Sequence, residues 1–279
     1  MTTDLRSRLS EPGAIVALLA HDGLTAKIAE RAGIEALYHG GYATAAHHFG
    51  LPDVGLVGRA EVVESVRRMR AATELPIVVD ADTGYGSEAG VWLTVRDLEA
   101  AGANAVQVED QVSPKRCGHM EGKEVIPADE MVIKVRAAVA ARRRDETLII
   151  ARSDALQVNG LDDAIERCNA YHDAGADLIF VDAPPTVEDY VAIGERCSAP
   201  GVANMSETGR SPAIPTVELE EMGYKLVIFP STQTWLFAKA YEELCDAVVR
   251  DRSTTAVADR FMSFDDVNSL LGLADWQSR

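Results

Sequence analysis

The hydrophobic positions of this chain repeat in one unit, which consists of a helical pattern ending at glycine, a short apolar run and a polar loop. In four copies the glycine is Gly33, Gly102, Gly175 or Gly223, and the apolar runs are 34–38, 105–108, 178–181 and 226–229. Glycine readily adopts the left-handed conformation that closes a helix. Apolar runs of this length, bounded by such signals, are typical of buried strands.

Four further apolar runs follow the same rhythm, at 15–19, 76–79, 148–151 and 202–205. Segments with helical spacing lie between the runs, such as Val91, Val95 and Leu98 after a potential cap at Ser87. Strands that alternate with helices form a parallel sheet. Eight such units in about 250 residues predict an α/β fold of the (β/α)8 TIM-barrel type. A doubly wound open sheet shares much of this pattern and is the less favoured alternative.

The domain prediction follows from where the repeating unit stops. Residues 1–250 are predicted to form a catalytic barrel domain, and residues 251–279 a C-terminal helical extension. The extension begins with the polar stretch 251–255 and continues with an amphipathic segment at about 264–273. Its apolar positions fit either packing on another subunit or capping of the chain's own barrel.

Composition narrows the classes of function. The formal net charge of -17 over 279 residues opposes binding to nucleic acid or to an anionic membrane, since both require a basic surface. The N-terminus lacks the apolar core of a signal peptide, and no apolar run is long enough to span a membrane. We therefore expect a cytoplasmic protein. Its four cysteines form no CxxC pair and are expected to be reduced thiols.

The chemistry of a (β/α)8 barrel lies at the C-terminal ends of its strands. The residues that follow the predicted strands are markedly polar: Tyr38-His39-Gly40-Gly41, Asp80-Ala81-Asp82, Glu109-Asp110, Arg152-Ser153-Asp154, Asp182, Asn204 and Pro230-Ser231. Asp80, Asp82 and Glu109 come from adjacent strands, and such hard oxygen ligands suit Mg²⁺, or Mn²⁺, better than zinc. The alternative is that Asp80 and Asp82 only organise the glycine-containing turn that follows them.

A thiol among three potential cations marks a candidate active-site loop. The pentapeptide Lys115-Arg116-Cys117-Gly118-His119 follows Glu109-Asp110 closely, and such surroundings favour thiolate and acid–base chemistry. Gly40-Gly41 offers backbone amides that are free of side-chain obstruction, which suits a carboxylate. Arg152 closes an apolar strand and needs a carboxylate partner, from the substrate or from the protein.

Four motifs occur together in one order and carry a family resemblance. They are Asp80-Ala81-Asp82-Thr83-Gly84-Tyr85-Gly86, Val108-Glu109-Asp110-Gln111, Lys115-Arg116-Cys117-Gly118-His119 and Ala151-Arg152-Ser153-Asp154-Ala155. With these motifs the chain resembles the isocitrate lyase and phosphoenolpyruvate mutase superfamily over about residues 10–273. It is most similar to the short lyase branch that contains 2-methylisocitrate lyase and 2,3-dimethylmalate lyase.

The resemblance implies a Mg²⁺-dependent retro-aldol cleavage of a 2-hydroxy dicarboxylate or tricarboxylate. The products would be a 2-oxo acid, such as glyoxylate or pyruvate, and a second carboxylate. By resemblance, Asp80 holds the metal directly, and Asp53, Asp82 and Glu109 hold it directly or through water. Relatives form homotetramers in which a C-terminal helix is exchanged between neighbours, which predicts the same assembly for this chain.

The resemblance also assigns roles to the remaining candidates. Cys117 would supply a proton to the carbanion, and Tyr38 is a possible partner in deprotonating the substrate hydroxyl. The 2-oxo acid portion would be bound by Arg152 and by the amides of Gly40 and Gly41. The second carboxylate would be bound by the loop that contains Gly118, through Lys115, Arg116 and His119, together with Asn204.

The chain departs from its relatives at three candidate substrate contacts. Gly40-Gly41-Tyr42 stands where this branch usually has Ser-Gly-Gly, and Asp182 stands where glutamate is common. Arg210 is unusual in its loop, and we hypothesise that it binds an extra anionic group of the substrate; a solvated arginine is the alternative. Two other functions stay open. One is decarboxylation or hydrolysis of an oxaloacetate-like acid, or phosphonopyruvate chemistry, and the other is non-catalytic binding of metal and carboxylate.

Overall fold

Eight parallel strands close into a barrel in the computed structural model, which describes residues 4–118 and 120–278. Each strand pairs with the next along the chain, and the last pairs with the first. The strands are β1 Ile15–Leu19, β2 Ala36–His39, β3 Ile77–Asp80, β4 Ala105–Glu109, β5 Leu148–Ser153, β6 Leu178–Val181, β7 Gly201–Asn204 and β8 Tyr224–Phe229. The closed order confirms the predicted (β/α)8 barrel over an open sheet.

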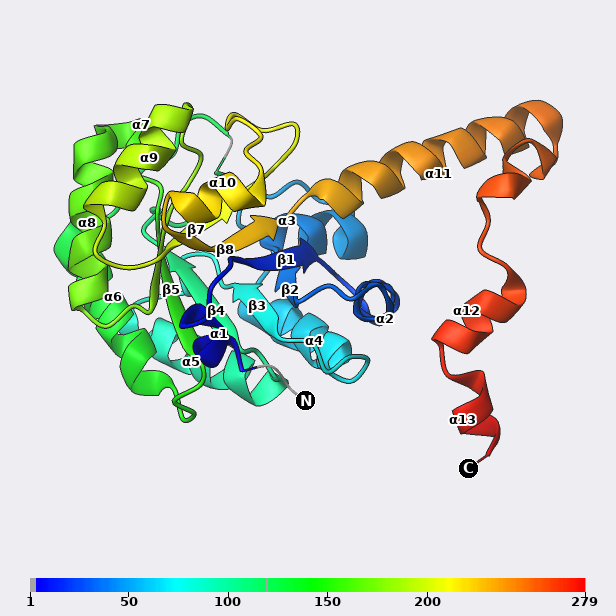
Figure 1. Ribbon diagram of the computed structural model, residues 1–279, viewed down its shortest axis with the longest axis horizontal. Coiled ribbons are helices and arrows are strands. Elements are labelled where there is room, and N and C mark those ends of the chain that lie inside the picture. The colour runs from blue at the N-terminus through cyan, green and yellow to red at the C-terminus, as the bar shows by residue number, and fades with distance from the viewer. Residues whose placement is uncertain (1–3, 119, 279) are drawn as a thin grey trace.

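Helices surround the barrel, and the last ones lie beyond it, as Figure 1 shows. They are α1 Leu5–Leu9, α2 Gly23–Ala32, α3 Gly41–Thr44, α4 Arg59–Arg70, α5 Glu88–Ala101, α6 Ala128–Ala141, α7 Leu156–Asn159, α8 Leu161–Asp173, α9 Val187–Arg196, α10 Thr216–Glu221, α11 Thr232–Asp251, α12 Phe264–Leu270 and α13 Leu273–Gln277. A π-helical turn, η1 Ala45–Phe49, follows α3, and a 3-10 turn, η2 Thr255–Arg260, follows α11. Gly33 and Gly102 cap α2 and α5 in the left-handed conformation, as predicted.

The predicted strands differ from the observed ones by one or two residues at their ends. The runs at 15–19 and 178–181 match β1 and β6, whereas β5 continues two residues beyond its apolar run to include Arg152 and Ser153. A buried charged side chain can stay in a strand when partners lie within reach, so the ladder runs past the point where hydrophobicity stops.

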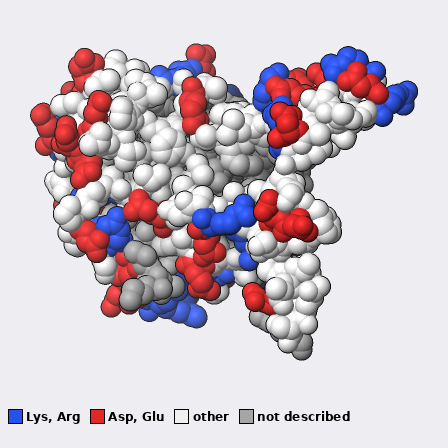
Figure 2. Space-filling view, turned by 45° about the vertical axis from the view of Figure 1, so that its right-hand side comes forward, with Lys and Arg blue, Asp and Glu red and all other residues white. Residues whose placement is uncertain are grey.

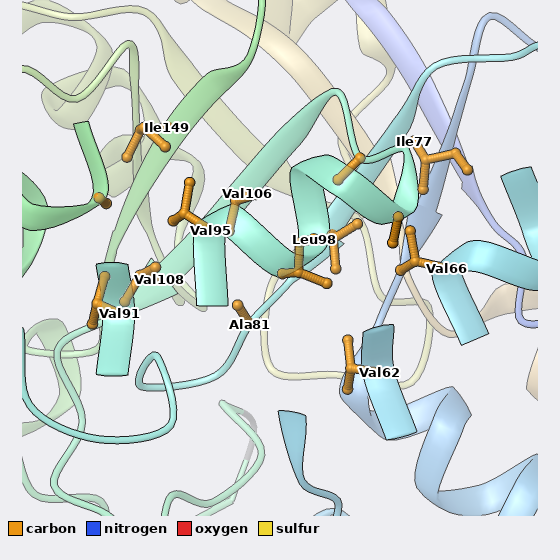
Figure 3. Close-up of a cluster of buried hydrophobic side chains, with 14 of the residues drawn as sticks. Val62, Val66, Ile77, Ala81, Val91, Val95, Leu98, Val106, Val108 and Ile149 are labelled. Carbon is orange, nitrogen blue, oxygen red and sulfur yellow. The ribbon is translucent and has the colours of Figure 1, made fainter. Parts of the chain in front are cut away.

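Two apolar layers hold the barrel together. Alternate strand residues fill the interior, for example Val78, Ala105 and Ile150, while α1 contributes Leu5 to the same cluster. The other strand residues face outward and pack against the helices. Figure 3 shows this outer layer, where Val106 and Val108 of β4 lie near Val91 and Val95 of α5. The period-two alternation of strand side chains produces both layers.

The same alternation carries polar residues to the mouth of the barrel. Asp80 follows Val78 on the inner face of β3, and Arg152 follows Ile150 on that of β5. Because the strands are parallel, their C-terminal ends meet at one rim. The register places Glu109 opposite Arg152, so the two charged groups meet there.

The C-terminal part of the chain leaves the barrel. In Figure 1, α11 projects away from the body, and the chain turns back through η2 to α12 and α13. Figure 2 shows this arm from another side, with charged residues gathered mainly on α11. The chain leaves the barrel within α11, before residue 250. The predicted domain boundary at that residue therefore stays a prediction. Among the described residues, no helix is long and apolar enough to cross a membrane.

Candidate active site

A cavity of about 230 Å³ opens at the C-terminal rim of the barrel. Most of the residues predicted from the sequence line it: Tyr38, Gly40, Gly41, Tyr42, Asp53, Asp80, Lys115, Cys117, Gly118, Arg152, Asp182 and Asn204. They come from different strands and from the loops that follow those strands. The structure therefore brings together at one rim residues that are far apart in the sequence.

Four buried carboxylates lie on one side of the cavity around a single ammonium group. Lys115 Nζ lies 2.6 Å from Asp53 Oδ1 and 2.9 Å from Asp82 Oδ1. Burial alone would lower the pKa of Lys115, but these carboxylates with Glu109 and Asp80 raise it well above its ordinary value, so Lys115 is charged. Burial raises the pKa of Asp82 to about 6, although Lys115 opposes the shift. The cluster carries more negative charge than one lysine balances.

This excess charge fits a divalent cation. Glu109 Oε1 is buried and accepts no hydrogen bond from any described residue, and burial raises the pKa of Glu109 well above its usual range. Within residues 4–118 and 120–278, no three His, Cys, Asp or Glu side chains converge closely enough to enclose an ion by themselves. Carboxylate oxygens are the ligands that Mg²⁺ prefers, and this ion takes one or two of them directly while it keeps several waters. Asp80, predicted as the direct ligand, faces the cavity.

Arg152 forms the other charged side of the cavity. Its guanidinium lies 2.8 Å from Asp154 Oδ2, 2.9 Å from Asp182 Oδ2 and 3.3 Å from Glu109 Oε2. Burial would lower the pKa of Arg152, but the three carboxylates raise it well above its ordinary value. Phe180 lies under the guanidinium at 5.3 Å. The predicted carboxylate partner is thus supplied by the protein. These contacts fix one side of the guanidinium, so that its other side can bind a ligand.

The loop that carries Cys117 is fastened over the cavity at both ends. The Cys117 amide donates to the Asp53 carbonyl at 3.2 Å, and Lys123 Nζ donates to the Gly118 carbonyl at 2.6 Å. Lys123 also pairs with Asp154 Oδ1 at 2.8 Å, which ties the loop to the partner of Arg152. The Cys117 side chain is half-buried and lines the cavity. A thiol so placed can reach a ligand bound between the acidic cluster and Arg152.

Comparison with known proteins agrees with this geometry. Residues 5–249 match the family model described as phosphoenolpyruvate phosphomutase. The chain is 42% identical to 2,3-dimethylmalate lyase of Eubacterium barkeri, over 96% of this chain and 93% of that protein. It is 39% identical to 2-methylisocitrate lyase of Aeropyrum pernix, over 99% and 88% respectively. The chain belongs to the phosphoenolpyruvate mutase and isocitrate lyase superfamily.

The fold of this superfamily member also matches solved structures along its whole length. Oxaloacetate acetylhydrolase in complex with the inhibitor 3,3-difluorooxalacetate superposes with a TM-score of 0.94 and 30% identity, covering 99% of this chain and 94% of that one. The predicted superfamily resemblance is confirmed, and so is the prediction that the chain is an enzyme, a lyase of this superfamily.

Tyr38 is held as a hydrogen-bond donor in this superfamily site. Its hydroxyl donates to Gln107 Oε1 at 3.3 Å, and the Gln107 amide donates to Asp80 Oδ1 at 3.2 Å. Burial, with Asp80 nearby, raises the pKa of Tyr38 well above its ordinary value. The phenolate is therefore disfavoured, which weakens Tyr38 as a base and favours it as an orienting group.

Two predicted substrate contacts do not line the cavity. Arg116 is exposed and donates to the Glu121 carbonyl at 3.3 Å, and Arg210 pairs with the Glu121 carboxylate at 3.1 Å. Both side chains are exposed to solvent, where a guanidinium keeps its hydration. This conformation gives no support to a direct contact with substrate for either residue. His119, predicted to act beside them, lies outside the described residues.

Sequence reasoning missed several residues of this site. Gln107 was read only as part of a buried strand, although its position two residues before Glu109 places it on the same inner face. Lys123 carried no local signal, because its partners Asp154 and Gly118 are brought near it only by the fold. Trp235, in the first turn of α11, also lines the cavity.

Proposed function

We propose that this protein is a divalent-metal-dependent carbon–carbon lyase that acts on a 2-hydroxy dicarboxylate or tricarboxylate of the 2,3-dimethylmalate or 2-methylisocitrate type. A retro-aldol reaction would give a 2-oxo acid, glyoxylate or pyruvate, and a second carboxylate. One observation carries the proposal: Cys117 lines the same cavity as Asp53 and Asp80 of the acidic cluster, with Arg152 also in its wall. The named lyases at 42% and 39% identity support it.

The reaction requires one proton to leave and one to arrive. The substrate hydroxyl loses its proton to solvent, the electron pair of the C2–C3 bond moves to C3, and the C2 carbonyl forms. In the proposal, Cys117 gives its proton to C3, where the negative charge is shared with the adjacent carboxylate. Arg152 would balance charge on the 2-oxo acid portion, with Gly40 and Gly41 close to its carboxylate. Tyr38, whose hydroxyl donates to Gln107 Oε1 in this structure, would turn that hydrogen toward the substrate oxygen and orient it as a neutral donor.

Mg²⁺, with Mn²⁺ as the alternative, is the proposed cofactor. Asp80 would hold it directly, and Asp53, Asp82 and Glu109 would hold it directly or through water, because these four groups form the acidic cluster. When bound, the ion would polarise the oxygens of the 2-oxo acid portion and so stabilise the charge that develops on them. Lys115 would keep the carboxylates positioned and partly neutralised.

The test is release of 2-oxo acid from a panel of acids, with both products identified by mass. The panel contains 2,3-dimethylmalate, 2-methylisocitrate, isocitrate, oxaloacetate and phosphonopyruvate, each with and without Mg²⁺. A 2-oxo acid together with an intact partner acid, lost on chelation and restored by Mg²⁺, is the expected result. Oxalate from oxaloacetate would instead favour hydrolysis, the alternative that the structural match to oxaloacetate acetylhydrolase keeps open.

We also propose that the arm packs on a neighbouring subunit in a homotetramer that acts in the cytoplasm. In the single chain, large apolar side chains of the arm are exposed: Val249 at 78%, Phe264 at 82% and Trp276 at 69%. Such a surface is costly in water unless another surface covers it. Light scattering of the full chain should give the mass of four subunits, and truncation after Asp251 should reduce it.

A further inference from the structure

Part of the cavity lining is an uncharged aromatic wall. The rings of Tyr42 and Trp235 lie 5.3 Å apart at an interplanar angle of 60°, and the uncharged residues Met120, Ile228 and Pro230 also line the cavity. Tilted aromatic pairs at this separation are favourable and hold each other in place. This wall, which we call the Tyr42–Trp235 wall, is a rigid apolar surface that faces the ligand.

The basic side chains described in the cavity lining are paired with carboxylates of the protein. Among the described lining residues, only Lys115 and Arg152 are basic. Lys115 is held by Asp53 and Asp82, and Arg152 by Asp154 and Asp182. A ligand carboxylate pressed against the Tyr42–Trp235 wall would therefore lose its water without gaining a positive partner, which is strongly unfavourable.

The Trp235 side chain of this wall nevertheless offers a neutral donor. Trp235 Nε1 is buried and has no hydrogen-bond acceptor among the described residues. Buried indole N–H groups normally find a partner, so this one points to an oxygen supplied by a ligand or by a water that accompanies it. Ser206 and Ser231 also line the cavity, and their hydroxyls lie 3.2 Å from each other. Recognition at this end therefore rests on neutral groups.

We infer that Trp235 is a specificity-determining residue, and that with Tyr42 it restricts the ligand to two carboxylates and an uncharged alkyl side group. The inference rests on the proposed function and narrows it to alkyl-substituted malates over tricarboxylates. The two carboxylates belong to the metal-binding and Cys117 sides of the cavity. The alkyl group lies against the Tyr42–Trp235 wall, where burial of apolar surface favours it.

Binding of two unreactive ligands of matched shape tests this inference without turnover. Isobutylsuccinate and tricarballylate differ chiefly in that two methyl groups of the first are replaced by the two oxygens of a third carboxylate. Their dissociation constants are measured by titration calorimetry on the full chain with Mg²⁺. We expect isobutylsuccinate to bind at least about tenfold more tightly. Equal affinities, tighter binding of tricarballylate, or no binding of either ligand would overturn the inference.

Variants at Trp235 locate the effect. Trp235→Arg adds a cation to the wall and should shift the ratio of affinities toward tricarballylate by about tenfold or more. Trp235→Phe keeps an aromatic ring without its N–H and should keep the preference for isobutylsuccinate. Trp92→Arg, on the outer face of α5 where Trp92 is 40% exposed, is the matched control and should leave the ratio unchanged. An unchanged ratio in a folded Trp235→Arg protein would refute the assigned role.

Failure of this inference can be told from failure of the proposed function. Cleavage of 2-methylisocitrate in preference to 2,3-dimethylmalate, with tighter binding of tricarballylate, would overturn the inference and leave the lyase proposal standing. A preference for isobutylsuccinate without cleavage of any 2-hydroxy acid would support the wall as assigned and overturn the lyase proposal.

Discussion

Replacing Gly118 by alanine tests whether the Cys117 loop must lie as close to Arg152 as the structure places it. A Cβ atom built on Gly118 would overlap Asp182 Oδ2 and Arg152 Nη2, and would lie 2.8 Å from Asp182 Cγ. Asp182 cannot move aside freely, because it is buried between Arg152 and Asn204. The loop, which lies at the surface of the barrel rim, is therefore the part that must move.

The size of the effect follows from these contacts. Carbon atoms in contact prefer about 3.5–4.0 Å, so the loop must shift by roughly 1 Å to clear Asp182 Cγ alone. A displacement of about 1 Å in a catalytic group can cost about 100-fold in rate. Cys117 precedes Gly118 directly and would be carried with it. The shift also breaks the bond from Lys123 Nζ to the Gly118 carbonyl, which contributes about 2 kcal/mol at most to the free energy of unfolding.

The assay measures kcat/KM on the 2-hydroxy acid that wild type cleaves, and the free energy of unfolding in urea. We expect Gly118→Ala to lower kcat/KM about 100-fold while unfolding changes by about 2 kcal/mol or less. Gly58→Ala is the control, because the nearest atom to its new Cβ is the carboxylate end of the Glu61 side chain, and neither residue lines the cavity. A Gly118→Ala enzyme within threefold of wild type would refute the close seating of the loop.

Three further predictions follow from buried groups. Asp154→Asn leaves Arg152 and Lys123 short of a buried carboxylate and should reduce the free energy of unfolding by about 3 kcal/mol; a change below 1 kcal/mol in urea denaturation would contradict this. Cys117→Ala removes the proposed proton donor and should lower kcat by about 100-fold or more with little change in ligand affinity; retained turnover would exclude the thiol. Burial lowers the pKa of His39 to about 4, so the unfolded chain binds a proton at this histidine before the folded chain does as pH falls. The free energy of unfolding of wild type should therefore fall by about 3 kcal/mol relative to His39→Gln between about pH 6.5 and pH 4. Above about pH 6.5 wild type should keep its full stability. Parallel pH profiles of the two proteins would contradict the burial argument for His39.

The barrel could be predicted from the sequence because its signals are local. Glycine caps and short apolar runs mark each unit, and eight units suffice for closure. The residues at the rim could also be predicted, since the alternation of side chains along a strand directs Asp80, Glu109 and Arg152 inward. The direction of a long loop side chain has no such rule. Arg116 faces outward although its neighbours Lys115 and Cys117 face the cavity, and only the folded path of the loop decides this.

Partners that come from distant segments could not be predicted either. The acidic pair Glu109-Asp110 looked like one functional unit, but the two carboxylates face opposite sides of β4. Asp110 accepts hydrogen bonds from Ser153 Oγ and Tyr171 at 2.8 Å and from the Asp154 amide at 2.9 Å, and it takes no part in the cavity. Its role is structural, and its donors lie on β5, directly after β5 and on α8, which no local pattern could connect to it.

Because Glu109 and Asp110 face opposite sides of the strand, pairing of β4 in the wrong register is disfavoured. If β4 were displaced by one residue, Asp110 would enter the cavity and Glu109 would face Ser153 and Tyr171. The shorter side chain would then lie beside Arg152, and the longer one would be forced into a space closed by those donors. Two buried anions would lose their partners at once. The contacts on the outer face of the strand thus fix the register that the inner face requires. A chain that completes its fold has therefore also aligned the charges of its catalytic rim.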